Sequence, residues 1–185
     1  MGYRLALANT TVPAGNVVAN TATRTTFADT GIIIDPNGDI GSGNGRLVTF
    51  TGYGYINSAA SSPGTLTLSI AYINTGSTTI LGTSTITLPA SLVNAGFMIQ
   101  GYVLVCATGQ TQGKVVAQGF LIVDNAGVPI SGAIVNPGTG STPQIAPTNG
   151  TASNQNISLG LAAQFSVANA ANTVTLSQLI VEVKN

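Results

Sequence analysis

Apolar residues recur at every second position over most of this chain, which is the period of a β-strand with one buried face. In the segment 65–72, Leu66, Leu68 and Ile70 alternate with threonine and serine. The segment 157–167 alternates in the same way and is the clearest strand of the sequence. The chain is therefore predicted to be all β.

Other segments with strand character are separated by turn-rich pieces at the intervals typical of sandwiches and barrels. A single helical turn is expected around Pro89–Ala95. Near Ser177 and Gln178 the apolar residues change from one parity to the other, which predicts a β-bulge. About eight to nine strands result, and we predict an antiparallel β-sandwich that is jelly-roll-like. Besides the two segments above, the predicted strands are 15–27, 31–35, 45–57, 77–88, 96–107, 113–124 and 172–183.

Two segments are predicted to be loops. The segment 35–45 is rich in Gly, Asn and Asp, and the segment 125–150 contains four prolines. A connection as long as 125–150 is uncommon in a compact domain unless it has a function, so we interpret it as a crossover or an intersubunit arm. No linker divides the chain, which predicts an extended N-terminal arm at 1–20 and a single sandwich domain at 21–185.

The charge content limits the partners. Lys and Arg number 5 and Asp and Glu number 5, so charged residues are 5% of the 185, against roughly 25% in ordinary soluble domains. A surface with so few charges favours association, so we expect a subunit of an assembly rather than a free monomer. Clustered Lys and Arg are lacking, which excludes a nucleic-acid partner. No apolar run approaches membrane-spanning length and no secretory leader is seen, so neither a membrane partner nor export is expected.

The residues that carry most enzyme chemistry are scarce. The chain has no His, one Glu (Glu182), one Cys (Cys106) and four Asp. Triads, acid–base pairs and zinc sites draw on these residue types. We therefore predict that the protein is not an enzyme, and assign no catalytic, cofactor-binding or metal-binding residue and no cofactor. Cys106 ends an apolar run, which favours a buried, inert thiol.

One loop carries oxygen ligands at alternate positions. Asp35, Asn37 and Asp39 are spaced as in a calcium-binding loop. The glycine and the bidentate glutamate of such a loop are replaced by Ile40 and Arg46, so a turn is the favoured interpretation.

Four tyrosines offer a possible sugar platform. Tyr53, Tyr55, Tyr72 and Tyr102 are all placed in predicted strands, where aromatic residues also pack well. We favour packing and keep a glycan-binding face as the alternative. The Thr-x-Thr triplets have no fixed period, so they indicate a neutral outer strand face.

Five segments occur in a particular order: 20–27, 45–54 (GRLVTFTGYG), 63–72, 96–105 (GFMIQGYVLV) and 172–183. This order resembles small virion proteins of tailed bacteriophages, namely the jelly-roll capsid decoration (cement) and head- or tail-fibre proteins. The resemblance implies a jelly-roll subunit, commonly a trimer, that is clamped on the capsid surface at junctions between major capsid proteins. It implies no catalytic residue.

The leading hypothesis is thus a non-enzymatic capsid decoration protein, made in the host cytoplasm and located on the capsid surface of the virion. Its expected partners are copies of itself, as a trimer, and the major capsid protein. Residues 2–20 and 125–150 are predicted to reach neighbouring subunits. The alternatives are a fibre module that binds host glycans and a single jelly-roll major capsid protein.

Overall fold

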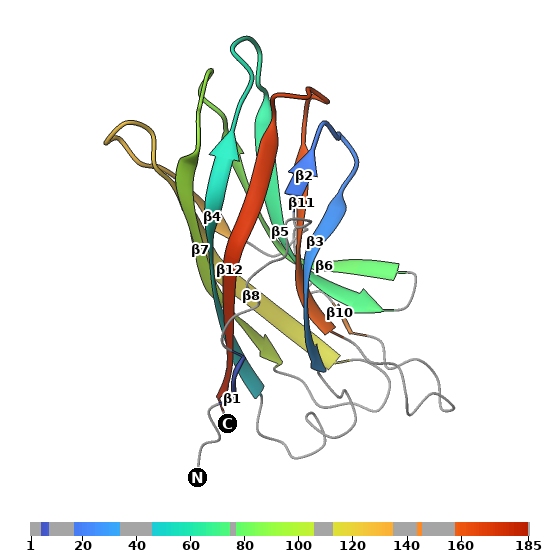
Figure 1. Cartoon of the computed structure of the whole chain (residues 1–185). Coiled ribbons are helices and arrows are strands. Elements are labelled where there is room, and N and C mark those ends of the chain that lie inside the picture. Colours follow the sequence, from blue (N-terminus) through green and yellow to red (C-terminus); the bar gives the residue numbers. More distant parts are fainter. Residues whose placement is uncertain are drawn as a thin grey trace.

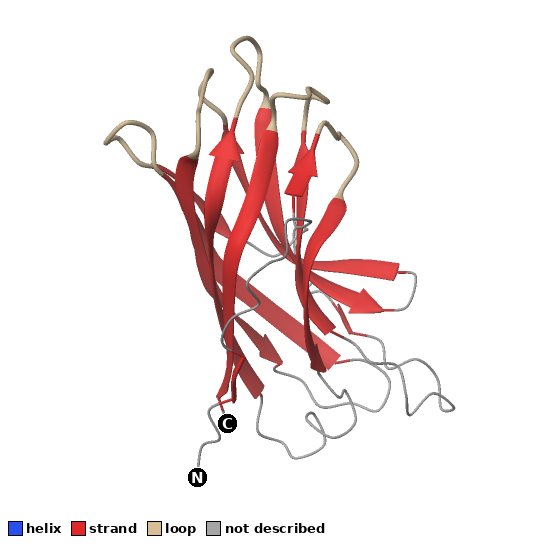
Figure 2. Cartoon of the chain, viewed as in Figure 1, coloured by secondary structure: helices blue, strands red, loops and turns tan. Residues whose placement is uncertain are grey.

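The chain folds into two facing antiparallel β-sheets, as Figures 1 and 2 show. The structure is a computed structural model that describes residues 5–7, 17–33, 46–74, 77–105, 113–134, 144–145 and 158–184. Every regular element within these ranges is a strand, so the predicted all-β sandwich is confirmed. No helix of the described residues is long and apolar enough to cross a membrane.

The larger sheet has the strand order β1-β12-β4-β7-β8-β10, with β2 also paired to β12 and β9 also paired to β8. The smaller sheet has the order β3-β11-β5-β6. The described residues thus form twelve strands, more than the nine predicted. Their bounds are β1 (Leu5–Leu7), β2 (Val17–Ala19), β3 (Thr25–Ile33), β4 (Arg46–Asn57), β5 (Thr65–Asn74), β6 (Ser77–Thr87), β7 (Ala95–Val105), β8 (Gly113–Val123), β9 (Ile130–Ile134), β10 (Gln144–Ile145), β11 (Ser158–Phe165) and β12 (Thr173–Lys184).

The pairing follows the order of a jelly roll. β2 pairs with β12, β3 with β11, β4 with β7 and β5 with β6, so each pair is nested inside the one before it. A long hairpin with its tip between β5 and β6 rolls up into two four-stranded sheets in this way. Strands β8, β9 and β10 follow β7 and widen the larger sheet.

The first predicted strands are placed differently in the structure. Segments 15–27 and 31–35 were predicted as strands, but β2 ends at Ala19 and β3 runs unbroken from Thr25 to Ile33. Asn20 has a positive φ of 47°, and the Thr23 amide donates a 3.0 Å hydrogen bond to the Thr21 hydroxyl. This turn carries the chain from the larger sheet to the smaller one.

The helical turn predicted around Pro89–Ala95 is wrong. Ser91 and Asn94 have positive φ angles of 61° and 49°, which a right-handed helix does not allow. Backbone hydrogen bonds instead tie this turn to the loop after β4, from Ser58 N to Leu92 O (3.0 Å) and from Ser91 N to Ala59 O (3.0 Å).

The segment predicted as one long loop, 125–150, contains β9 and β10, because β8 offers a free edge for pairing. The predicted arm 1–20 contains β1 and β2, both paired to β12. Residues 1–4, 8–16, 135–143 and 146–150, the Asp35–Asp39 loop and Cys106 lie outside the described residues. The division at residue 20 stays a prediction.

The predicted bulge in the last strand is confirmed. The register of β12 against β4 shifts between Leu176 and Gln178. The shift keeps Leu176 and Leu179 on the same inward side, where both are buried. The core lies between the sheets and takes its largest fully buried side chains from both: Phe165, Ile56, Leu66, Leu68, Ile70, Leu81, Ile99, Leu121 and Leu176.

Two glycines let β7 and β8 approach closely at the centre of the larger sheet. Gly101 and Gly119 are direct partners. A Cβ on Gly119 would lie 2.2 Å from the Gln100 carbonyl oxygen, and one on Gly101 would lie 2.7 Å from Cζ of Phe50. Backbone cannot move aside as a flexible side chain can, so only glycine fits.

We therefore expect Gly119→Ala to lower the free energy of unfolding by about 2 kcal/mol or more, as overpacking does. Urea denaturation measures it. Gly96→Ala is the matched control, because a Cβ there has no atom within 4 Å. Equal denaturation midpoints for the two variants would contradict the close approach.

Candidate functional site

The two outer faces of the sandwich differ in chemistry. On the smaller sheet, Thr67, Thr83, Thr85 and Thr87 point outward, and the hydroxyls of Thr67 and Thr85 lie 2.9 Å apart in a hydrogen bond. This is the neutral strand face that the Thr-x-Thr triplets predict. Further along this sheet Ser69 is buried.

The outer face of the larger sheet is instead aromatic and aliphatic. Its residues follow from the strand register, which aligns side chains of β12, β4, β7, β8 and β9 in rows. We call it the aromatic face. Its rows are Thr175, Tyr55 and Gly96; then Gln178, Tyr53, Met98, Ile122 and Ser131; then Ile180, Thr51, Gln100, Phe120 and Ala133; then Glu182, Thr49, Tyr102 and Gln118; then Lys184, Leu47, Leu104 and Val116.

Large rings on the aromatic face are partly open to solvent. Tyr53 is 40% exposed, Tyr55 is 38% exposed and Phe120 is 37% exposed. Tyr102 is half-buried, and its hydroxyl donates a hydrogen bond to Oε1 of Gln118 on the neighbouring strand. This bond fixes two neighbouring side chains of the face in one arrangement.

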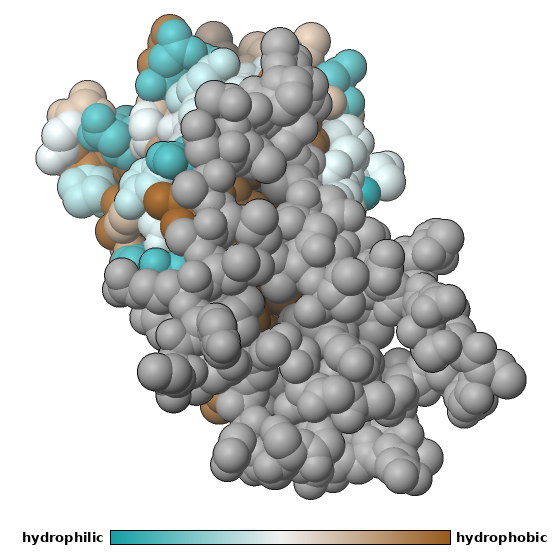
Figure 3. Space-filling model, turned by 60° about the horizontal axis from the view of Figure 1, so that its bottom comes forward, coloured by the Kyte–Doolittle hydropathy of each residue, from teal (hydrophilic) through white to brown (hydrophobic). Residues whose placement is uncertain are grey.

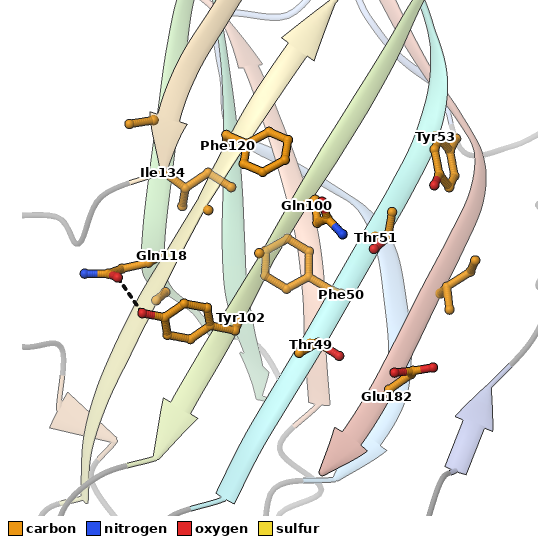
Figure 4. Close-up of a pocket in the computed structure, with 15 residues that line it drawn as sticks. Thr49, Phe50, Thr51, Tyr53, Gln100, Tyr102, Gln118, Phe120, Ile134 and Glu182 are labelled. Atoms are coloured by element: carbon orange, nitrogen blue, oxygen red, sulfur yellow. Dashed lines mark hydrogen bonds between the residues drawn. The ribbon is translucent and has the colours of Figure 1, made fainter.

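The centre of the aromatic face is hollowed into a shallow depression of about 940 Å³. Figure 4 shows Thr51, Gln100 and Phe120 side by side on β4, β7 and β8, with Tyr102 and Gln118 in the next row. The other residues of the lining are Thr49, Phe50, Tyr53, Gly101, Ala117, Gly119, Ala133, Ile134, Ile180 and Glu182.

The structure places three of the four tyrosines of the possible sugar platform on one face. Tyr53, Tyr55 and Tyr102 share the aromatic face. Tyr72 belongs to β5 of the smaller sheet, so it cannot join them. The sequence interpretation also missed Phe120, because β8 is apolar on both parities and only the tertiary structure shows which one is inward.

Charge is nearly absent from this face. Glu182 is the one charged residue of this face whose side chain the structure describes, and the strand register also aligns Lys184, at the end of β12, with Leu47. Within the same described part of the chain, no three His, Cys, Asp or Glu side chains come together as metal ligands would. Over its described part, the surface visible in Figure 3 mixes hydrophobic with hydrophilic residues.

A second surface is the end of the sandwich at which the described loops gather (Figure 2). We call the loops 20–24, 58–64, 88–94, 124–129 and 166–172 the loop end. Val93 is 76% exposed and Val128 is 69% exposed, each in a different loop. The loop end has two charged residues, Arg24 and Asp124.

The buried side chain of Asn172 connects three parts of the loop end. Its Nδ2 donates to the carbonyl oxygens of Pro63 (2.9 Å) and Val167 (3.3 Å), and its Oδ1 accepts from the Ala59 amide (2.9 Å). Asn172 has 0% exposure. These bonds hold the loops after β4 and β11 together.

Ser58 connects the loop after β6 in the same way. Its hydroxyl donates to the Pro89 carbonyl oxygen (2.5 Å) and accepts from the Leu92 amide (2.9 Å). The exposed Val93 therefore follows directly after a braced residue and stands on a rigid support.

Comparisons with known proteins show little similarity. No family model matches the chain, and no curated protein matches it. Among solved structures it is similar to the CBM2 module of the evolved Dit of Lactobacillus casei BL23 phage J-1, with a TM-score of 0.32 and 11% sequence identity. The match covers 91% of this chain and 74% of that one.

We expect Asn172→Ala to lower the free energy of unfolding by about 2 to 3 kcal/mol, because it leaves a buried amide and two carbonyl groups without their partner. Thermal or urea unfolding measures the loss. Asn169→Ala is the control, since Asn169 Oδ1 accepts an exposed hydrogen bond from Ala171 N (2.9 Å) and its loss costs about 1 kcal/mol or less. Similar losses in both variants would show that Asn172 does not hold the loops.

Proposed function

We propose that the protein is a non-enzymatic structural component of a virion that decorates and stabilises a capsid, as a homotrimer bound to the major capsid protein. One observation carries the proposal: large aromatic and aliphatic side chains are interspersed with neutral polar ones over the outer face of the larger sheet. Soluble antiparallel sheets ordinarily present a polar face to water, as the smaller sheet does with its threonines. A face of this kind marks a contact with another macromolecule.

The composition of the aromatic face is that of a protein interface. Interface cores are depleted in charge and enriched in Tyr, Phe and Met. Tyr53, Tyr102, Phe120 and Met98 all belong to the aromatic face, against one described charged side chain, Glu182. Charged residues make up 5% of the whole chain, which agrees with a protein that functions as part of an assembly.

The loop end suits attachment to the shell. Val93 is exposed on a braced loop, so ordering it costs little entropy when a partner binds, and Val128 is exposed on the turn 124–129. Because the loop end has only two charges, the surface that it fits is neutral protein rather than nucleic acid.

A second candidate function is glycan recognition by a fibre module. The depression favours it, since the rings of Tyr53 and Phe120 can stack on the C–H faces of a sugar and the amides of Gln100 and Gln118 can bind its hydroxyls. A sugar in the depression would leave Leu104, Val116 and other outlying apolar residues uncovered, so we rank it second.

Co-sedimentation with capsid shells that lack the protein tests the proposal. We expect the wild-type chain to sediment with shells, and the double variant Val93→Asp with Val128→Asp to bind at least tenfold more weakly, because each removes about 1 kcal/mol or more of apolar contact. Thr85→Asp on the smaller sheet is the control and should bind as the wild type does. Absence of wild-type binding to shells would refute decoration.

Binding of neutral oligosaccharides by the purified chain tests the second candidate. We expect none. Glycan binding that is lost in both Tyr53→Ala and Gln100→Ala, but kept in Thr85→Ala, would support the fibre function in place of capsid decoration.

A further inference from the structure

We infer that the partner covering the aromatic face is a second copy of this chain, in a closed symmetric oligomer. The inference rests on the proposed function, because it names the partner of the face that the function buries. It goes further by locating self-association on the outer surface of β12, β4, β7 and β8, and not on the threonine face or the loop end.

The polar groups of the aromatic face are of the kind that can meet their own copies. An amide or a hydroxyl both donates and accepts, so it can pair with an identical group at a rotation axis and with a different polar group away from the axis. Gln100, Thr51 and Tyr53 at the centre of the face are of this type. A lysine or a carboxylate at the centre would face its own like charge and be repelled.

The charged residue of the face agrees with this arrangement. Glu182 lies on β12, which is paired on its far side with the short strands β1 and β2, so Glu182 lies toward one side of the face. The central row, from Ile180 through Gln100 to Phe120, carries no charge. Copies can therefore bury the centre while Glu182 stays near the rim.

The size of the face also fits. Four neighbouring strands of about nine residues cover roughly 20 by 30 Å, on the order of 600 Å² in projection. Because side chains protrude from the sheet, the accessible surface area of the face is larger than its projected area. Each partner in a standard interface buries roughly 800 Å². The accessible area of the aromatic face is of this order, so a second copy that covers the face would form a stable contact.

The surface of the aromatic face has both a recess and protruding rings, so its shape can complement that of a second copy. The depression at the centre lies beside the partly exposed rings of Tyr53 and Phe120. A copy related by rotation brings its own rings toward this hollow, and the same contact is repeated around the axis. A protruding aromatic side chain that fills a recess in its partner is the usual anchor of an interface.

Light scattering of the full-length chain in the absence of shells tests the inference. The expected mass is a small multiple of 18.5 kDa that persists on dilution. Phe120→Arg should give a folded monomer. Each copy would then bury a guanidinium group in the contact, and these like charges would repel one another. Thr85→Arg, on the threonine face, is the matched control and should keep the wild-type mass.

A second variant covers the case in which Phe120→Arg does not fold. Gln100→Glu conserves size but places like charges in the contact, so it should dissociate the oligomer at low salt and recover part of it at high salt, where the charges are screened. A wild-type monomer at every concentration overturns the inference. So does an oligomer whose mass is unchanged in both folded variants.

The outcomes separate this inference from the proposed function. An oligomer that depends on the aromatic face but does not bind shells upholds the inference and refutes decoration. A monomer that binds shells upholds decoration and overturns the inference, since the face is then covered by the capsid protein.

Discussion

The fold depends on one constraint: the larger sheet has apolar side chains on its outer face as well as toward the core, so the smaller sheet can bury only part of them. The smaller sheet covers the inner face, with Leu161 of β11 reaching to within 3.6 Å of where a Cβ on Gly52 would lie. Nothing among the described residues plays the same part for the outer face, where Tyr53 and Phe120 remain partly exposed. The oligomer that we propose would complete the burial that folding begins.

The jelly-roll order explains how one chain produces two such different outer surfaces. In the nested order, successive strand pairs belong to opposite sheets. The pair β4 and β7 therefore lies in one sheet, and the pair β5 and β6 lies in the other. Each strand buries one parity in the common core. The other parity is threonine in β5 and β6 and aromatic or aliphatic in β4, β7 and β8.

The loop end and the aromatic face have separate structural supports. The face is held by strand register and by the close approach of Gly101 and Gly119, whereas the loop end is held by buried hydrogen bonds to Asn172 and Ser58. A rigid support lowers the entropy lost on binding, which matters for a surface with few charges to attract a partner. The two surfaces can thus serve two different contacts in one assembly.

The period-two alternation was sufficient to predict the β class, most strand positions and the bulge in β12, because a strand that buries one face must alternate. Local sequence also limited the chemistry, since His is absent and charges are few. It could not show which parity of β8 faces inward, because Ala117, Leu121, Phe120 and Ile122 are all apolar. It could not separate Tyr72 from Tyr53 either. Those facts depend on which strands pair, and pairing between residues far apart in sequence is decided only when the whole core packs.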